Sequence, residues 1–162
     1  MRSGMYWFGL LIAVVFAGCD SATKIAGEYS YKASGTVAID GAAFALGDEQ
    51  GTLDLLRKTD ERMLLMFSPF RGGVYTAGAM VGDTVLTLYP FSRTVKVSFT
   101  DTVLVGGIES VRKKEEVFDV EVTGKGMLYK EAIVFDLYYH GASQSSDALL
   151  KGENILLVAK KN

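Results

Sequence analysis

The sequence has a single cysteine, Cys19, a single histidine and a single tryptophan among its 162 residues. One cysteine cannot form a disulfide within the chain, and one histidine excludes the common zinc sites, which combine several histidine and cysteine ligands. Proline is nearly absent, with only Pro69 and Pro90, and the net charge is −2. This slight acidic excess argues against a nucleic-acid partner, which normally meets a basic face.

An uncharged apolar run, Met5–Gly18, follows Arg2 at the start of the chain. It is shorter than the roughly 20 apolar residues that a membrane-spanning helix needs. Its length is typical of the apolar core of a secretory signal, and Ala17 and Gly18 leave room for a peptidase at its end. We therefore predict that residues 1–18 are a signal peptide.

The residues Phe16-Ala17-Gly18-Cys19 resemble the lipobox of bacterial lipoproteins, with Phe16 where leucine is usual. The resemblance implies that the Cys19 sulfur carries a diacylglyceryl group, whose acyl chains hold the protein to a membrane. It implies a lipid-anchored protein of the bacterial cell envelope, at the outer or inner membrane, facing the periplasm or the surface. An ordinary signal peptide with a chance cysteine is the alternative. Residues 19–26 then form a short tether that reaches at most about 25 Å.

From Gly27 onward, apolar and polar residues alternate, as in Val95, Val97 and Phe99 against their polar neighbours. This period of two predicts strands with one face in a core and one in water. A strand at 35–39 either stands alone or continues the first strand past a bend at Gly35. The pattern predicts strands near 28–33, 35–39, 51–56, 62–67, 73–80, 84–89, 94–99, 103–111, 116–123, 127–140 and 153–160.

The short spacing between these segments favours hairpins, and so an antiparallel sheet. We predict one all-β domain, residues 27–162, in which an up-and-down meander closes into a small barrel and leaves no free edges. A two-sheet β-sandwich is the alternative.

The stretch Gly27-Glu28-Tyr29 followed by a meander of strands resembles the lipocalin or calycin group. The resemblance implies a barrel that holds a small apolar or amphipathic ligand. Two positions depart from the lipocalin pattern. Tyr29 stands where that group has tryptophan, and the last strand offers Lys160 and Lys161 where it has a late arginine.

The sequence gives little support to catalysis. A Ser-His-Asp arrangement would have to use His140, and no Gly-x-Ser-x-Gly motif is present. Asp40, Asp48 and Glu49 do not have the spacing of an EF-hand and are interpreted as a polar loop. Asp136 interrupts an apolar run and is interpreted as a solvent-facing residue, with a ligand-orienting role as the alternative. We expect no enzyme activity, no cofactor and no metal.

Two stretches, "FSPFR" and "LYPFSR", each place an aromatic residue, Pro-Phe and an arginine at the end of a strand. They indicate either two turned strand ends or a paired rim that attracts an anionic head group. The first functional hypothesis is a membrane-anchored binding module. The second is an envelope accessory protein with a filled barrel and an unidentified protein partner. The candidate ligand-binding residues are Tyr75, Tyr89, Phe99, Phe135, Tyr139, Arg71 and Arg93.

Overall fold

The computed structural model describes residues 21–162. The predicted signal peptide, residues 1–18, and the predicted acylation site, Cys19, lie outside the described residues. Within residues 21–162 the elements are α1 (Ser21–Ile25), β1 (Gly27–Ile39), β2 (Ala42–Arg57), β3 (Arg62–Pro69), β4 (Tyr75–Val81), β5 (Val85–Val105), β6 (Ile108–Leu128), β7 (Ala132–Ser143) and β8 (Leu149–Lys161).

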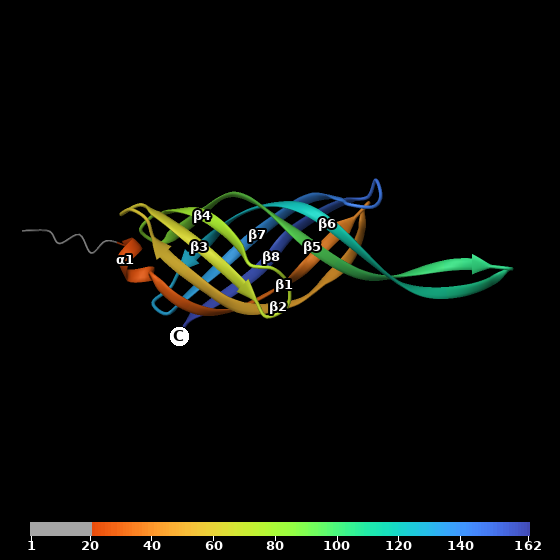
Figure 1. The fold of residues 1–162 in the computed structure, drawn as a ribbon, viewed down its shortest axis with the longest axis horizontal. Coiled ribbons are helices and arrows are strands. Elements are labelled where there is room, and N and C mark those ends of the chain that lie inside the picture. The colour runs from red at the N-terminus through yellow and green to blue at the C-terminus, as the bar shows by residue number, and fades with distance from the viewer. Residues whose placement is uncertain (1–20) are drawn as a thin grey trace, which may run out of the picture.

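The eight strands of the described chain form a closed barrel in sequence order, and each is antiparallel to the next (Figure 1). The ring closes where β8 pairs with β1, from Tyr29 opposite Lys161 to Ile39 opposite Leu150. The predicted up-and-down barrel is therefore confirmed, and the sandwich alternative is wrong. The predicted strands 28–33 and 35–39 are one strand, β1, with a register shift between Ala33 and Gly35.

The barrel interior is filled by apolar side chains that alternate with outward-facing polar ones. Burial of each large apolar side chain stabilises the fold by about 1.5–3 kcal/mol relative to leaving it in water. The largest fully buried side chains are Phe67, Phe118, Phe135, Leu53, Leu55, Leu65, Leu86, Ile133, Leu150, Ile155, Leu157 and Val37. The barrel is thus a packed core along most of its length and not a hollow cup.

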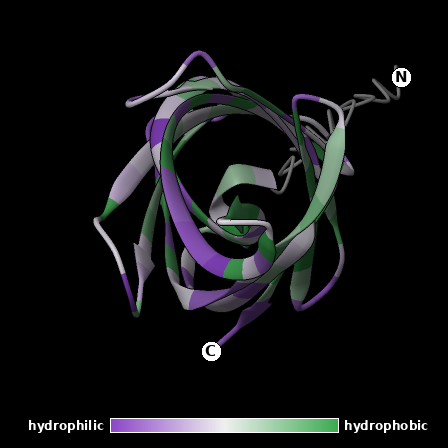
Figure 2. Ribbon diagram, turned by 90° about the vertical axis from the view of Figure 1, so that its right-hand side faces the viewer, coloured by the Kyte–Doolittle hydropathy of each residue, from purple (hydrophilic) through white to green (hydrophobic). Residues whose placement is uncertain are grey.

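Helix α1 lies within the outline of one end of the barrel (Figure 2). Ala22 is completely buried, and the Tyr29 hydroxyl donates a hydrogen bond of 2.8 Å to the Ile25 carbonyl. Residues 19–26 were predicted to form a tether. In the structure, Ser21–Ile25 of this segment form a helix that packs against the barrel. Among residues 21–162, no helix is long and apolar enough to cross a membrane.

The strands are longer and fewer than predicted. The segment 40–49, interpreted as a polar loop, belongs mostly to β2, because Ala42–Leu46 pairs with β1 beyond the register shift. The predicted strands 84–89 and 94–99 are joined in β5, which continues through Pro90. The predicted strand 103–111 is split by a turn at Gly106 and Gly107, whose φ angles of 61° and 82° suit a tight hairpin turn.

The hairpin of β5 and β6 extends far beyond the barrel at the end opposite α1 (Figure 1). Here, from Thr100 opposite Lys113 to Val105 opposite Ile108, the two strands pair only with each other. We refer to residues 100–114 as the arm. Both of its strands leave an edge without a backbone partner in the described chain.

Candidate functional site

A cleft opens in the barrel wall because β3 and β4 are shorter than their neighbours. β2 pairs with β3 only from Gly51 onward, and β5 pairs with β4 only through Leu86–Leu88. Beyond these points β2 and β5 face each other across a gap, which the loop 70–74 bounds. The resulting cleft has a volume of about 940 Å³ and is lined by residues 46–50, 69–75 and 92–96.

A partly buried ion pair between Glu49 of β2 and Arg93 of β5 bridges this gap. The Arg93 Nη2 atom donates to one carboxylate oxygen of Glu49, and Nη1 lies 3.2 Å from the other. The side chains retain only 13% (Arg93) and 21% (Glu49) of their accessible surface. The two-point contact fixes the guanidinium in one plane, as such forked pairs do.

Three tyrosine hydroxyls surround the ion pair. Tyr31 and Tyr75 donate to the same Glu49 oxygen, at 2.9 Å and 3.0 Å. Arg93 Nη1 donates to the Tyr75 hydroxyl at 2.8 Å and lies 3.4 Å from that of Tyr139. We refer to these five residues as the polar cluster. They come from β1, β2, β4, β5 and β7, so the complete barrel is needed to assemble it.

The polar cluster is charged at neutral pH. Burial alone would raise the pKa of Glu49, but hydrogen bonds and charge from Arg93 outweigh burial and lower it. Burial opposes the charge of Arg93, yet the Glu49 hydrogen bonds raise the pKa of Arg93. Burial raises the pKa of Tyr75, so its hydroxyl keeps its proton. One donor remains: the buried Nε of Arg93 has no acceptor among the described residues.

An aromatic layer separates the polar cluster from the core. The Phe67 ring stacks on Tyr75 at 4.8 Å and meets Tyr31 edge-on at 5.9 Å. Phe91 stacks on Tyr75 at 5.8 Å, and Phe135 meets Phe67 from the core side at 6.5 Å. The rings of Phe67, Tyr75 and Phe91 therefore close the side of the polar cluster that faces Phe135.

The rim of the cleft mixes apolar and charged side chains. Phe70 is 72% exposed and Val74 is 62% exposed, and both lie on the loop 70–74 together with the exposed Arg71. Asp48 and Lys96 stand on the opposite sides of the opening, where Lys96 also pairs with Glu115 at 2.5 Å. An amphipathic ligand would find both an apolar wall and a cation here.

The structure brings together only part of the predicted ligand-binding set. Tyr75, Arg93 and Tyr139 meet in the polar cluster, and Arg71 lies on the rim of the same cleft. Phe135 is fully buried in the core. Phe99 lies toward the arm, with its ring 5.1 Å from that of Phe44 and 5.4 Å from the Lys114 ammonium.

Tyr89, another predicted ligand-binding residue, does not line the cleft. It is 42% exposed on the outer surface, where its ring covers Gly78 so closely that an added Cβ would lie 2.9 Å away. A bulge accounts for this position, since the register with β6 shifts between Leu88 and Phe91. Even-numbered residues face inward before the bulge, and odd-numbered ones after it.

Glu49 is the central residue that the sequence analysis missed. The register shift between β1 and β2 near Gly47 changes which positions face inward, from Phe44 and Leu46 to Glu49, Gly51 and Leu53. The change from even to odd apolar positions was visible in the sequence. Glu49 is an acidic residue at an odd-numbered position, on the same face of the strand as Leu53. This is the signal that could have identified it.

The remaining chemical candidates lie outside the cleft. Asp136 is on the outer face, where it accepts a hydrogen bond of 3.1 Å from Tyr138, as the solvent-facing interpretation expects. His140 is exposed on the same face. Among residues 21–162, no three His, Cys, Asp or Glu side chains are grouped so as to hold a metal ion.

Comparison with known proteins does not assign a family. No protein-family model and no curated protein matches the chain. Among solved structures, EF1p2_mFAP2b bound to DFHBI is similar, with a TM-score of 0.47 and 10% identity over 88% of this chain and 98% of that one. Ail, the attachment invasion locus protein of Yersinia pestis, has a TM-score of 0.47 and 12% identity over 84% of this chain and 98% of that one.

Proposed function

We propose that the protein is a non-enzymatic binding module that holds a small anionic amphiphile in the cleft between β2 and β5. The observation that carries this proposal is the cleft itself. Its lining includes the charged side chains of the polar cluster, which are held in place by hydrogen bonds to one another. Its volume of about 940 Å³ is within the range of small-molecule sites, about 300–1,000 Å³.

The lining favours a ligand with an apolar body and an acidic head. Phe70, Val74 and Pro69 provide an apolar wall, while the guanidinium of Arg71 is free to meet an anion at the rim. Because Glu49 already neutralises Arg93, the inner cation does not require a ligand charge.

Titration of residues 20–162 with dodecanoate, followed by calorimetry, tests the proposal. We expect saturable binding at one site, and weaker binding of the uncharged analogue dodecanol. Arg71→Ala should weaken dodecanoate binding by up to about fivefold, as expected for an exposed ion pair. It should leave dodecanol binding unchanged.

Arg62→Ala is the matched control, because Arg62 is also exposed but begins β3 away from the cleft. Its affinity for dodecanoate should equal that of the wild type. Equal weakening by both arginine variants would show that the effect is general surface charge, and no saturable binding would reject the amphiphile.

We further propose that an acyl group on Cys19 holds the module to a bacterial membrane. Ser21, the first residue of α1, follows Cys19 by two positions, so the α1 end of the barrel would face the bilayer. The Lys161 ammonium lies 5.9 Å from the centre of the Tyr29 ring at this end. This contact places a cation, Lys161, over the aromatic ring of Tyr29 near the start of β1, and it supports the likeness to the lipocalin group.

The anchor is tested by expressing the full chain with Cys19→Ala in a bacterial host. We expect the variant to stay unprocessed or become soluble, and to leave the detergent phase in which the wild type partitions. Ser21→Ala is the control and should behave as the wild type. A Cys19→Ala protein of mature size in the detergent phase would refute lipidation.

A further inference from the structure

The arm carries exposed apolar side chains on both of its faces: Leu104 and Val111 share one face, and Ile108 lies on the other. Leu104 is 70% exposed, Ile108 is 74% exposed and Val111 is 69% exposed. An isolated two-stranded hairpin is only marginally stable in water, and its free edges are templates for pairing with another strand. The arm therefore has the properties of a docking element.

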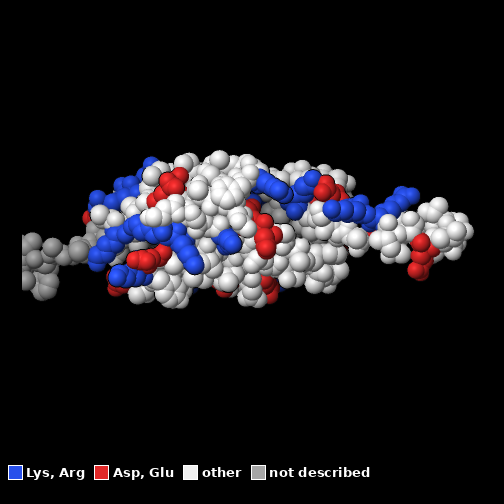
Figure 3. Space-filling model, turned by 90° about the horizontal axis from the view of Figure 1, so that it is seen from below, with Lys and Arg blue, Asp and Glu red and all other residues white. Residues whose placement is uncertain are grey.

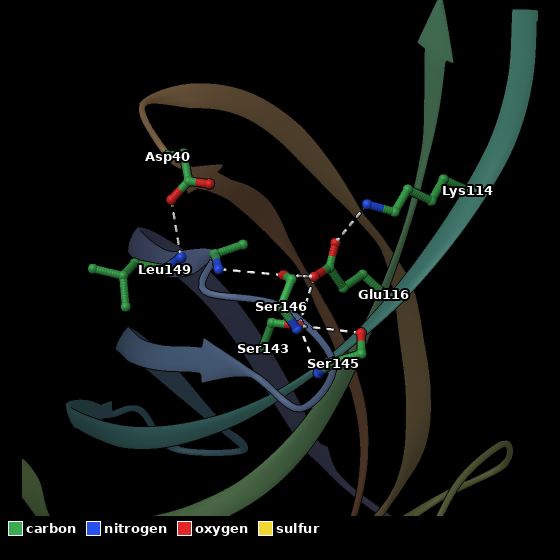
Figure 4. Close-up of polar contacts among 8 residues, drawn as sticks. Asp40, Lys114, Glu116, Ser143, Ser145, Ser146 and Leu149 are labelled. Carbon is green, nitrogen blue, oxygen red and sulfur yellow. Dashed lines mark hydrogen bonds and ion pairs between the residues drawn. The ribbon is translucent and has the colours of Figure 1, made fainter. Parts of the chain in front are cut away.

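The base of the arm is joined to the barrel by contacts of the buried carboxylate of Glu116 (Figure 4). Glu116 accepts hydrogen bonds from Ser143, at 2.5 Å, and from Ser146, and pairs with Lys114 at 3.3 Å. These contacts join β6 to the loop between β7 and β8. The arm points away from the α1 end of the barrel (Figure 1).

Charges on the β6 strand of the arm divide between its two ends. Arg112, Lys113 and Lys114 follow one another near the barrel, and Glu109 lies next to the tip. Figure 3 shows basic side chains along the arm near the barrel and an acidic one farther out. On the β6 edge, Glu109, Val111 and Lys113 share the outward face, since alternate residues of a strand point the same way.

We propose that the β6 edge of the arm pairs with the same edge of a second copy of this chain. A two-fold axis perpendicular to the sheet makes such a contact antiparallel and keeps each face on its own side. With the axis at Val111, Glu109 of each copy lies opposite Lys113 of the other. Ser110 lies opposite Arg112, and Ile108 opposite Lys114.

The two registers with the same symmetry that are centred nearer the barrel are less favourable. With the axis at Arg112, two arginines meet and Glu109 faces Glu115. With the axis at Lys113, lysine meets lysine and Arg112 faces Lys114. Like charges directly opposite each other destabilise a strand pair. The β5 edge has a single charge, Asp101, and offers no complementary partner.

Antiparallel pairing places the two barrels, and their α1 helices, at opposite ends of the dimer. This arrangement suits molecules on two facing surfaces and not neighbours in one bilayer. The contact is independent of the cleft, and we expect it in the domain without its lipid. Residues 20–162 contain every strand of the closed barrel, so they provide the folded unit for the test.

Sedimentation velocity of residues 20–162 over a range of concentrations is the experiment. We expect a monomer–dimer equilibrium that weakens as salt is raised. Lys113→Glu and Glu109→Lys should each weaken it at least tenfold, because each places like charges opposite one another. Mixing these two variants should restore a dimer, since both pairs between positions 109 and 113 are then of opposite charge.

Recovery of the dimer in the mixture would show that the single variants lose the specific charge pairing and that the arm itself is undamaged. Lys130→Glu, in the turn between β6 and β7, is the matched charge control and should dimerise as the wild type does. A wild type that stays monomeric at the highest concentration would overturn the proposal. So would single variants that dimerise normally, or a mixture that does not recover.

Discussion

Replacing Glu49 with alanine is expected to lower the free energy of unfolding by about 3 kcal/mol, the lower end of the range for a buried pair, because the pair is partly exposed. The variant leaves the Arg93 guanidinium buried with no carboxylate, and breaking one side of a buried ion pair has this cost. Arg93→Ala should be similarly damaging, because Glu49 then keeps only its tyrosine donors. Urea denaturation of both variants measures the loss.

The double variant Glu49→Leu/Arg93→Met decides whether the loss comes from an unpaired charge. It removes both charges and keeps apolar volume, so we expect it to be more stable than either single variant. The exposed pair of Lys96 and Glu115 is the control, and Glu115→Ala should change stability little. A double variant no more stable than the single ones would contradict this account.

The pH dependence of the stability of Glu49→Gln tests whether the ionised Glu49 carboxylate stabilises the folded state. The folded-state pKa of Glu49 lies below its ordinary value of 4.5, so its ionised form stabilises the fold at neutral pH. That contribution is complete above the unfolded-state pKa and is lost as the pH falls through the folded-state pKa. The stability gap between wild type and variant should therefore narrow below about pH 5.

The sequence predicted the barrel well because alternation is a local property. The faces of Val95, Val97 and Phe99, or of Phe118 and Val120, follow from a period of two alone. Antiparallel order follows from the short connections between strands. Neither inference requires knowledge of which residues meet across the barrel.

The cleft could not be predicted in the same way. It depends on two bulges, near Gly47 and at Tyr89–Pro90, each of which exchanges the inward and outward faces of a strand. It also depends on β3 and β4 stopping early, and on a contact between Glu49 and Arg93 across 44 residues. Pro90 suggested that one strand ends and another begins. In the structure β5 continues through this position, and only its register with β6 shifts.

Substitution of Phe67 with alanine is the second change for which we expect a large effect, a loss of about 3–5 kcal/mol. Phe67 is 1% exposed, and its ring contacts the rings of Tyr31, Tyr75, Phe91 and Phe135. Removing it leaves a cavity between the polar cluster and the core that those rings cannot fill. Phe67→Leu should lose less and provides a folded variant if Phe67→Ala unfolds.

The cavity itself gives a test that simple destabilisation cannot imitate. A void lined by aromatic rings stays dry and can bind benzene, so benzene should raise the melting temperature of Phe67→Ala and not of the wild type. Phe70→Ala is the matched control, because that ring is 72% exposed at the rim of the cleft. It should melt as the wild type does. If Phe67→Ala lost no more stability than Phe70→Ala, packing of the Phe67 ring would not be what stabilises this part of the barrel.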